Sequence, residues 1–408
     1  MKCRFCETEL SDVFIDLFHS PASNSFLDAS QLNAPETYYP LKVFTCHSCF
    51  LVQVDEYKSF DSIFDNNYVY FSSYSSTWLE HARTYVEMMT ERFQLNAQSQ
   101  VIEIASNDGY LLQYFVKKQI PVLGIEPTAN TAEIAKTKGV DTLVDFFGVR
   151  LATQLGKDNR KADLLLGNNV LAHVPDIVDF TRGLKLALKD TGVITMEFPH
   201  LVKLIENNQF DTVYHEHFSY LSFTTVRAIF EAAGLTLFDV DEIPTHGGSL
   251  RIYARHTENN ALPVSTKVMA LLKKEEVTGI RDLNYYAGFQ QRALAIKVAL
   301  MEFLIAQKAA GKKVAAYGAA AKGNTLLNYC GIKNDLIDFV VDLNPNKQKK
   351  FLPGSHIPVV DENHLKQQKP DYVIIFPWNI KEEIQQQLSY IKEWQGRFVI
   401  TIPQFHIV

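Results

Sequence analysis

The stretch Val101-Ile102-Glu103-Ile104-Ala105-Ser106-Asn107-Asp108-Gly109 predicts a buried strand, a tight turn and the start of a helix. Its strand part is apolar apart from Glu103, as expected of a strand inside a parallel sheet. Gly109 has no side chain, so the turn around Asn107 can aim backbone amides at a ligand and let it approach closely. The stretch therefore predicts an α/β fold with a ligand site after its first strand.

Further strands and helices alternate along the next part of the chain, which indicates a parallel sheet with helices on both faces. Glu126 follows the second strand, about twenty residues past the turn, and is placed to accept hydrogen bonds from ribose hydroxyls. Asp145 and Phe146 end the next strand and offer an acid and an aromatic face suited to adenine. Asn168 and Asn169 close a later strand, and His173 follows them. These residues are the candidate ligand contacts of the first unit.

A second strand, small-residue turn and helix start occurs near residue 314, after a helical segment predicted over about 283–310. Gly318 and Lys322 lie in this turn and helix start, and Asp342 ends the following strand. A helix N-terminus with a lysine suits a diphosphate. The alternative is tight helix–sheet packing without a ligand. We expect three domains, over residues 1–56, 57–255 and 256–408.

Two CxxC pairs, Cys3/Cys6 and Cys46/Cys49, lie near the N-terminus. Four thiolates supply a tetrahedral cage for structural Zn²⁺, with no open position for catalysis. The alternatives are a redox pair or plain buried thiols, and Cys330 is expected to be such a thiol.

The composition excludes several classes of partner. The net charge of −6 and the absence of a dense Lys/Arg stripe argue against nucleic acid and membrane surfaces. No apolar run has the length of a bilayer span, and no signal segment is evident. We therefore expect a cytoplasmic protein with a small-molecule partner, monomeric or a small homo-oligomer.

The order of the motifs resembles the class I S-adenosylmethionine-dependent methyltransferases. The usual glycine-rich ExGxGxG is here Glu-Ile-Ala-Ser-Asn-Asp-Gly, with only the last glycine kept. Another nucleotide-binding Rossmann domain is the alternative, but no triple glycine is present to cradle the phosphates of NAD. The implied cofactor is S-adenosylmethionine.

The whole chain resembles, more narrowly, the sugar-nucleotide 3-C-methyltransferases of deoxysugar biosynthesis. That resemblance rests on the doubled CxxC, Gly-Ile-Glu-Pro, Asp-Phe-Phe, Asn-Asn-Val-Leu-Ala-His, Tyr-x-Glu-His, His-Gly-Gly and Tyr-Gly-Ala-x-Ala-Lys, in this order. It implies a class I methyltransferase core between an N-terminal zinc module and a C-terminal Rossmann-like domain. It also implies methylation at C-3 of a dTDP-linked 4-keto-6-deoxyhexose.

The resemblance also implies roles for the tetrad Tyr214-His215-Glu216-His217. His217 is the expected general base, Glu216 its neighbour and Tyr214 a hydroxyl facing the substrate. One of Tyr68, Tyr70 and Tyr74 adds a further hydroxyl, with Tyr70 the first choice. His246 and Gly247 are expected beside the substrate, and His215 inherits no role.

Forming a carbon–carbon bond requires an enolate, so the site needs a base and donors for the enolate oxygen. If the tetrad is extended, His215 and His217 face the same side. That geometry leaves a histidine-bound metal as an alternative, although the HExxH spacing is absent. The alternative without a catalytic role is that the tetrad is a polar hinge between domains, with its histidines hydrogen-bonded. At the level of function, the alternatives are O- or N-methylation and a non-catalytic zinc/Rossmann scaffold.

Overall fold

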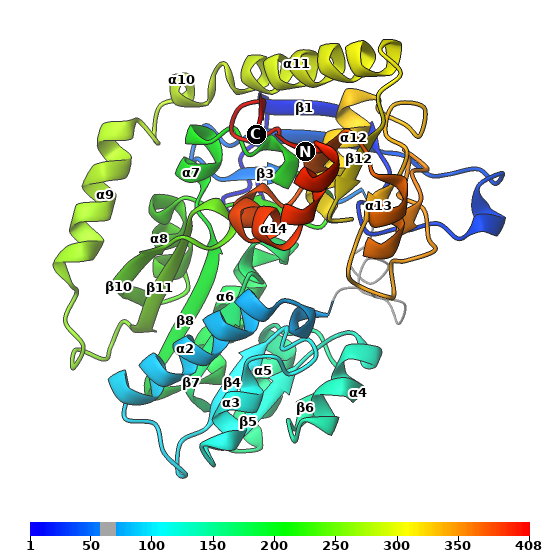
Figure 1. Cartoon of the computed structure of the whole chain (residues 1–408). Coiled ribbons are helices and arrows are strands. Elements are labelled where there is room, and N and C mark those ends of the chain that lie inside the picture. Colours follow the sequence, from blue (N-terminus) through cyan, green and yellow to red (C-terminus); the bar gives the residue numbers. More distant parts are fainter. Residues whose placement is uncertain (58–70) are drawn as a thin grey trace.

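The computed structural model describes residues 1–57 and 71–408 of the chain. Strands in these residues form sheets of four, seven and six strands. In Figure 1 the seven-stranded sheet and its helices lie in the lower half, and the six-stranded sheet lies near the top beneath one long helix. Tyr68 and Tyr70 fall outside the described residues.

The seven-stranded sheet has the order β10-β11-β8-β7-β4-β5-β6. All neighbouring strands from β8 to β6 are parallel, whereas β11 is antiparallel to both β8 and β10. An antiparallel strand in this position distinguishes the sheet from the six-stranded order of dinucleotide-binding Rossmann domains. The strands are β4 (Val101–Ile104), β5 (Val122–Ile125), β6 (Thr142–Leu143), β7 (Ala162–Asn168), β8 (Leu188–Pro199), β10 (Leu235–Ile243) and β11 (Ser249–His256).

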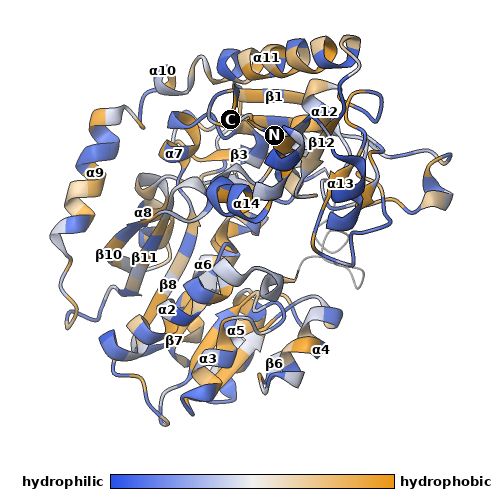
Figure 2. Cartoon of the chain, viewed as in Figure 1, coloured by the Kyte–Doolittle hydropathy of each residue, from blue (hydrophilic) through white to orange (hydrophobic). Residues whose placement is uncertain are grey.

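Alternate residues of these strands feed two separate apolar cores. Val101 and Leu164 face the core on one side of the sheet, and Ile102 and Leu165 face the core on the other. Such alternation is required of a sheet covered on both faces, and the strands are predominantly hydrophobic in Figure 2. The first core contains side chains of α2 (Ser76–Arg92), α3 (Leu112–Lys117) and α4 (Ala129–Thr137), and the second contains those of α5 (Val149–Lys157), α6 (Ile177–Ala187) and α8 (Phe223–Ala232).

The N-terminal module is an antiparallel sheet of β1 (Asp12–Ser20), β2 (Tyr39–Thr45), β3 (Val52–Val54) and β9 (Ser219–Tyr220). Its fourth strand, β9, comes from far along the chain, directly after the tetrad. The sheet is also part of the C-terminal core, where Phe14 of β1 stacks on Phe289 at 4.7 Å between ring centroids. The module therefore packs against both the segment after the tetrad and the C-terminal part of the molecule.

The six-stranded sheet has the order β14-β13-β12-β15-β16-β17 and is parallel except for β17. Chain order reverses between β12 and β15, and ligands of open α/β sheets bind outside the carboxyl ends of strands at such a point. The strands are β12 (Val314–Tyr317), β13 (Val340–Val341), β14 (Val359–Val360), β15 (Tyr372–Ile375), β16 (Arg397–Ile400) and β17 (His406–Ile407). The accompanying helices are α12 (Ala321–Cys330), α13 (Glu362–Gln368) and α14 (Lys381–Gln387).

Three helices connect the two large sheets: α9 (Thr266–Thr278), α10 (Leu283–Tyr286) and α11 (Phe289–Ala309). The segment predicted as one helix over about 283–310 is thus divided, because Gly288 adopts a left-handed conformation with φ of 81°. Val268 and Leu271 of α9 pack into the core of the seven-stranded sheet. A short helix, α7 (Leu201–Glu206), follows β8.

Among the described residues, none of the helices combines the length and the apolar character needed to cross a bilayer.

Candidate active site

The tetrad forms a turn rather than the extended segment considered above. The amide of His217 donates to the carbonyl of Tyr214 at 2.9 Å, which closes the turn. His215 consequently points away from His217: its Nε2 lies 3.1 Å from the carbonyl oxygen of Pro40, and its ring contacts Tyr39. The two histidines of the tetrad therefore do not come together as metal ligands.

His217 is held with a defined ring orientation. Its Nδ1 lies 2.9 Å from the carbonyl oxygen of Thr212. A carbonyl only accepts, so Nδ1 carries the proton and Nε2 of the neutral ring keeps its lone pair. The rings of Tyr214 and His173 lie 4.0 and 4.6 Å from that of His217, between centroids. The free nitrogen is thus part of a compact aromatic cluster.

The histidines of this cluster are neutral at pH 7. Burial, reinforced by His173, lowers the pKa of His217 well below its ordinary 6.5, although the Thr212 hydrogen bond raises it. Burial also lowers the pKa of His173 to about 4 and that of His246 to about 3. A neutral imidazole with a free nitrogen can accept a proton, so His217 is in the form that a general base requires.

Glu216 receives its partner from the N-terminal module. The side-chain amide of Asn24 lies 2.8 and 2.9 Å from the two carboxylate oxygens of Glu216. The loop that carries Asn24 is held by α12, because Asn324 donates to the carbonyl of Ser23 at 2.6 Å. Thr325 of the same helix donates to the carbonyl of Val213, next to the tetrad, at 2.8 Å. All three parts of the chain therefore meet at the tetrad.

The turn after β4 has the shape of a ligand loop. Ala105 and Asn107 have φ of 54° and 49°, and Gly109 has φ of +73°. Glu126 accepts the amides of Asn107 at 2.8 Å and Thr128 at 2.9 Å. Its position after β5 places it beside the turn, as the sequence predicts, and burial raises its pKa. These contacts hold the turn and the acid together at the carboxyl ends of β4 and β5.

Glu103 lies beneath this turn and is fully buried in β4. Burial raises its pKa well above the ordinary value of 4.5, and a hydrogen bond with Tyr110 acts in the opposite direction. Burial therefore favours the protonated form of this carboxyl group at the base of the loop.

Asn168 and Asn169 lie at the end of β7 and behave differently. Asn169 donates through Nδ2 to Nε2 of His246 at 2.9 Å, which connects β7 to the segment before β11. Both amide atoms of Asn168 are buried and make no hydrogen bond with the described residues. Buried amides of native proteins nearly always have partners. The unpaired amide of Asn168 therefore marks a place for a polar ligand group beside the loop.

Asp145 and Phe146 lie nearer the surface. Asp145 pairs with the exposed Arg150 and accepts the amide of Phe146 at 2.8 Å. The next residue, Phe147, contacts Phe180 with 5.4 Å between ring centroids. Tyr74 is 57% exposed and contacts Phe71.

The turn after β12 is closed by its own side chains. Asp342 accepts the amide of Ala319 at 2.8 Å, and Lys347 donates to the carbonyl of Ala319 at 2.8 Å. Gly318 has φ of +88°, and a Cβ there would lie 2.4 Å from Pro377. Glycine is needed at this position because no other side chain fits. The same turn leads into α12, whose N-terminus has no side-chain cap.

Lys322, in the first turn of α12, extends away from this turn. Its Nζ lies 2.8 Å from Oδ1 of Asn379 and 4.3 Å from the ring centroid of Trp378. Trp378 in turn donates to the buried Asp211 at 2.7 Å. Sequence reasoning missed Asn24, Asp211 and Trp378 because none of them belongs to a motif; only the fold brings them to the tetrad.

The four cysteines of the N-terminal module come together. Their sulfur atoms lie within 4.8 Å of one another, although no disulfide joins them. Gln53 adds a donor to Sγ of Cys3 at 3.2 Å, the kind of outer contact that orients a metal-binding sulfur. In the described part of the chain no other group of His, Cys, Asp or Glu meets the same criterion. The arrangement fits a structural zinc ion with four sulfur ligands.

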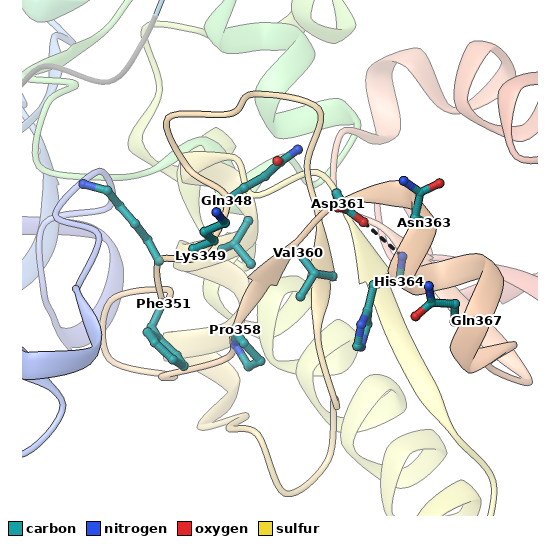
Figure 3. A pocket seen from close by; sticks show the side chains of 11 residues that line it. Gln348, Lys349, Phe351, Pro358, Val360, Asp361, Asn363, His364 and Gln367 are labelled. Atoms are coloured by element: carbon teal, nitrogen blue, oxygen red, sulfur yellow. Dashed lines mark hydrogen bonds between the residues drawn. The ribbon is translucent and has the colours of Figure 1, made fainter.

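A surface pocket of about 480 Å³ lies apart from this site, beside β14 and the start of α13 (Figure 3). Asp361 there accepts the amide of His364 at 3.0 Å and so caps α13. None of the predicted site residues lines this pocket.

A sheet with one antiparallel strand, a loop with left-handed residues after its first strand and an acid after its second define a class of protein. The chain is a class I S-adenosylmethionine-dependent methyltransferase that also carries a zinc module and a second Rossmann-like domain. The buried amide of Asn168 and the loop at Gly109 fit the methyl donor.

Known domain families match successive parts of the chain. The family described as "Putative zinc binding domain" matches residues 3–64, the "Methyltransferase domain" residues 78–240, and the "C-methyltransferase C-terminal domain" residues 244–403. C-methyltransferase NovU of Streptomyces niveus is 32% identical over 408 residues, which are 100% of this chain and 96% of that protein. The chain therefore belongs to the family of C-methyltransferases that includes NovU, and it transfers methyl groups from S-adenosylmethionine to carbon.

Solved methyltransferases align with less than half of the chain. An S-adenosylmethionine-dependent methyltransferase from Clostridium acetobutylicum has a TM-score of 0.35 and 10% identity, over 44% of this chain and 92% of that one. Magnesium protoporphyrin IX methyltransferase from Synechocystis, with bound S-adenosylhomocysteine, has a TM-score of 0.35 and 14% identity, over 44% and 82%.

Proposed function

We propose that this C-methyltransferase removes the proton at C-3 of a dTDP-linked 4-keto-6-deoxyhexose and methylates that carbon. The observation that carries the proposal is His217, a neutral histidine with a free Nε2 at the junction of the methyltransferase core and the second Rossmann-like domain. A carbon acceptor needs such a base, and a nucleotide-linked substrate needs a second nucleotide-binding domain.

The chemical demand explains why the acceptor carbon lies next to a ketone. Between an imidazole and a carbon acid of this kind the pKa gap is on the order of ten units, or roughly 14 kcal/mol. No single base covers that gap, so donors must stabilise the enolate oxygen as the proton leaves. A sugar carbon without an adjacent carbonyl would leave the gap larger still.

In this proposal Nε2 of His217 takes the C-3 proton, and the electron pair of the C–H bond forms the enolate. S-adenosylmethionine supplies the methyl group on a sulfonium centre. Glu216, oriented by Asn24, accepts a sugar hydroxyl, and Tyr214 donates to the ring. Tyr70 remains the first candidate for a further hydroxyl at the sugar, and Tyr68 and Tyr74 are the alternatives. His246 and Gly247 line the sugar near Asn169 in this proposal.

The methyl donor occupies the carboxyl ends of β4, β5 and β7 in this proposal. Its proposed contacts are Glu103, Asn107, Gly109, Glu126, Asp145, Phe146, Asn168, Asn169 and His173. The nucleotide of the substrate lies on the C-terminal domain in this proposal, beside the uncapped N-terminus of α12, which follows Gly318, and beside Asp342, which follows β13 and accepts the amide of Ala319. Chain order reverses at this point of the sheet, which is where open α/β sheets bind nucleotides.

Solvent exchange tests the proposal directly. The protein is incubated in D₂O with dTDP-, UDP- and GDP-linked 4-keto-6-deoxyhexoses, first without and then with S-adenosylmethionine. We expect deuterium at C-3 without the methyl donor and a mass gain of one methyl group with it, both for the dTDP sugar. The variant His217→Gln lacks the proposed base and should abolish both the deuterium exchange and the methyl transfer. Methyl transfer to an acceptor that shows no deuterium exchange at C-3 would contradict the proposal.

A further inference from the structure

We propose that Lys322, delivered by the C-terminal domain, is the cation that stabilises the enolate oxygen, so that the second Rossmann-like domain completes the catalytic site. This inference rests on the proposed function and assigns to Lys322 a role at the reacting ring instead of the diphosphate.

The position of Lys322 is built from three side chains. Its ammonium lies over the ring of Trp378, with 4.3 Å between Nζ and the centroid, and donates to Asn379. The indole N–H of Trp378 donates to Oδ2 of Asp211 at 2.7 Å. Asp211 is 1% exposed, and its Oδ1 makes no hydrogen bond with the described residues. A buried carboxylate is costly unless a positive charge lies near it. Lys322 supplies that charge.

The 3₁₀ helix Phe210–Thr212 connects Lys322 with His217, because it carries both Asp211 and Thr212. Asp211 precedes Thr212 in the 3₁₀ helix Phe210–Thr212, and the Thr212 carbonyl fixes the His217 ring. On the other side, Gly247 fits against Trp378, because a Cβ there would lie 2.5 Å from Cζ3 of the indole. The indole therefore lies between Lys322 and the segment of His246. A ketone held against His217 comes within the field of this ammonium.

The electrostatics agree with this placement. The charge of Lys322 contributes to the lowered pKa of both His217 and His246. Burial lowers the pKa of Lys322 itself to about 8, while Asp211 raises it. The ammonium is therefore mostly protonated at pH 7, and its lowered pKa makes it a strong donor.

The turn after β12, where a diphosphate would bind, has a different lysine. Nζ of Lys347 lies 2.8 Å from the Ala319 carbonyl and 3.8 Å from Asp342. Among the described residues Lys322 instead contacts Asn379 and Trp378, and Trp378 bonds to Asp211. This division leaves Lys322 for the reacting sugar.

Nε2 of His217 takes the C-3 proton, the C–H electron pair forms a C-3–C-4 double bond, and the carbonyl π pair moves to O-4, to which Lys322 donates. O-4 then re-forms the carbonyl as C-3 bonds to the methyl carbon and the methyl–sulfur bond breaks, with its electron pair remaining on sulfur.

The rate of deuterium exchange at C-3 without methyl donor tests this role. For Lys322→Met we expect a fall of about 100-fold or more, the usual cost of one oxyanion donor, with KM for the sugar nucleotide within about threefold. Lys381→Met, which removes a charge nearby on α14, should exchange like the wild type. Binding of S-adenosylhomocysteine checks that each variant is folded. A raised KM with unchanged exchange would overturn the inference in favour of diphosphate binding.

The pH profile is a second and independent readout. Because the protonated lysine is required, kcat should fall as pH rises through about 8. Lys322→Arg should move this basic limb to higher pH, and Asp211→Asn should move it lower. A limb that stays in place in both variants would overturn the inference. If the wild type itself shows no exchange with any keto sugar, the proposed function fails instead.

Discussion

Asn24 lies in the zinc module, yet its amide contacts both carboxylate oxygens of Glu216. A carboxylate with a fixed donor keeps one orientation, which a sugar hydroxyl can then recognise. In the proposed function the N-terminal module therefore contributes to the active site through Asn24, in addition to its four cysteines.

Asn24→Ala should lower kcat/KM by about tenfold, or ~1.4 kcal/mol, because Glu216 loses the donor that orients it. Steady-state kinetics with the keto sugar nucleotide measure the change. Asn33→Ala, an exposed asparagine of the same module, is the matched control and should leave kcat/KM unchanged. An unaltered kcat/KM in Asn24→Ala would show that Glu216 needs no such partner.

The acid limb of kcat/KM should lie below pH 6.5. His217 works in its neutral form, and burial with His173 lowers its pKa well below that value. Activity is therefore complete above the lowered pKa and is lost as pH falls through it. Rates measured from pH 4.5 to 8 locate the limb. His215→Gln, on the far side of the turn, should leave it in place, and a limb at or above pH 6.5 would refute the assignment of His217.

The tetrad could be recognised in the sequence as a candidate site, but its conformation could not be predicted. The hydrogen bond from His217 to Tyr214 is local, but the orientation of His215 toward Pro40 depends on a contact far apart in sequence. Lys322 illustrates the same limit, since nothing in its motif indicates the contact with Trp378 or the bond from Trp378 to the buried Asp211.

At the scale of elements, α9 holds α8 through one side chain. Glu275 is 1% exposed and accepts the amides of Phe223 and Thr224, each at 2.7 Å, and it also pairs with His200. It thereby satisfies the free N–H groups of the first turn of α8, and its charge complements the helix dipole.

Glu275→Ala should destabilise the protein by about 3 kcal/mol at pH 7, because it leaves buried donors unpaired. Burial raises the pKa of Glu275, but His200 and Thr224 outweigh it, so the net pKa is lowered. Its contribution is thus present above the unfolded pKa of about 4.3 and is lost as pH falls through the folded value. Urea unfolding at pH 7 and pH 4 measures this. Glu276→Gln, an exposed neighbour, is the control; equal losses in both variants would contradict the capping role.

Strand and helix order was predictable because short, almost continuous apolar runs alternate with segments of helical pattern. The division at Gly288 was not, since the flanking residues favour helix and only the left-handed φ of 81° separates α10 from α11. Strand β9 was also missed, because two residues carry no periodicity.

For the whole molecule, we expect zinc to influence catalysis, although four sulfur ligands leave the ion no open coordination position for substrate. The cysteine cage holds the turns beside β2 and β3, and β3 pairs with β9 directly after the tetrad. A chelator, or Cys46→Ala, should therefore lower both the unfolding midpoint and kcat. Thermal unfolding and methyl transfer before and after zinc is restored measure the effect. Cys330→Ala, which removes a buried thiol outside the cage, should leave the chelator response unchanged; full activity of the zinc-free protein would disprove the coupling.

The pairing of β3 with β9 also governs the order of events during synthesis. Residues 52–54 leave the ribosome long before residues 219–220, which at 5–20 residues per second is a delay of roughly 10–30 seconds. Throughout that interval the nascent N-terminal sheet has an open edge at β3, the kind of edge to which other chains add. The module can take its metal early, but its sheet is complete only when most of the methyltransferase core has emerged.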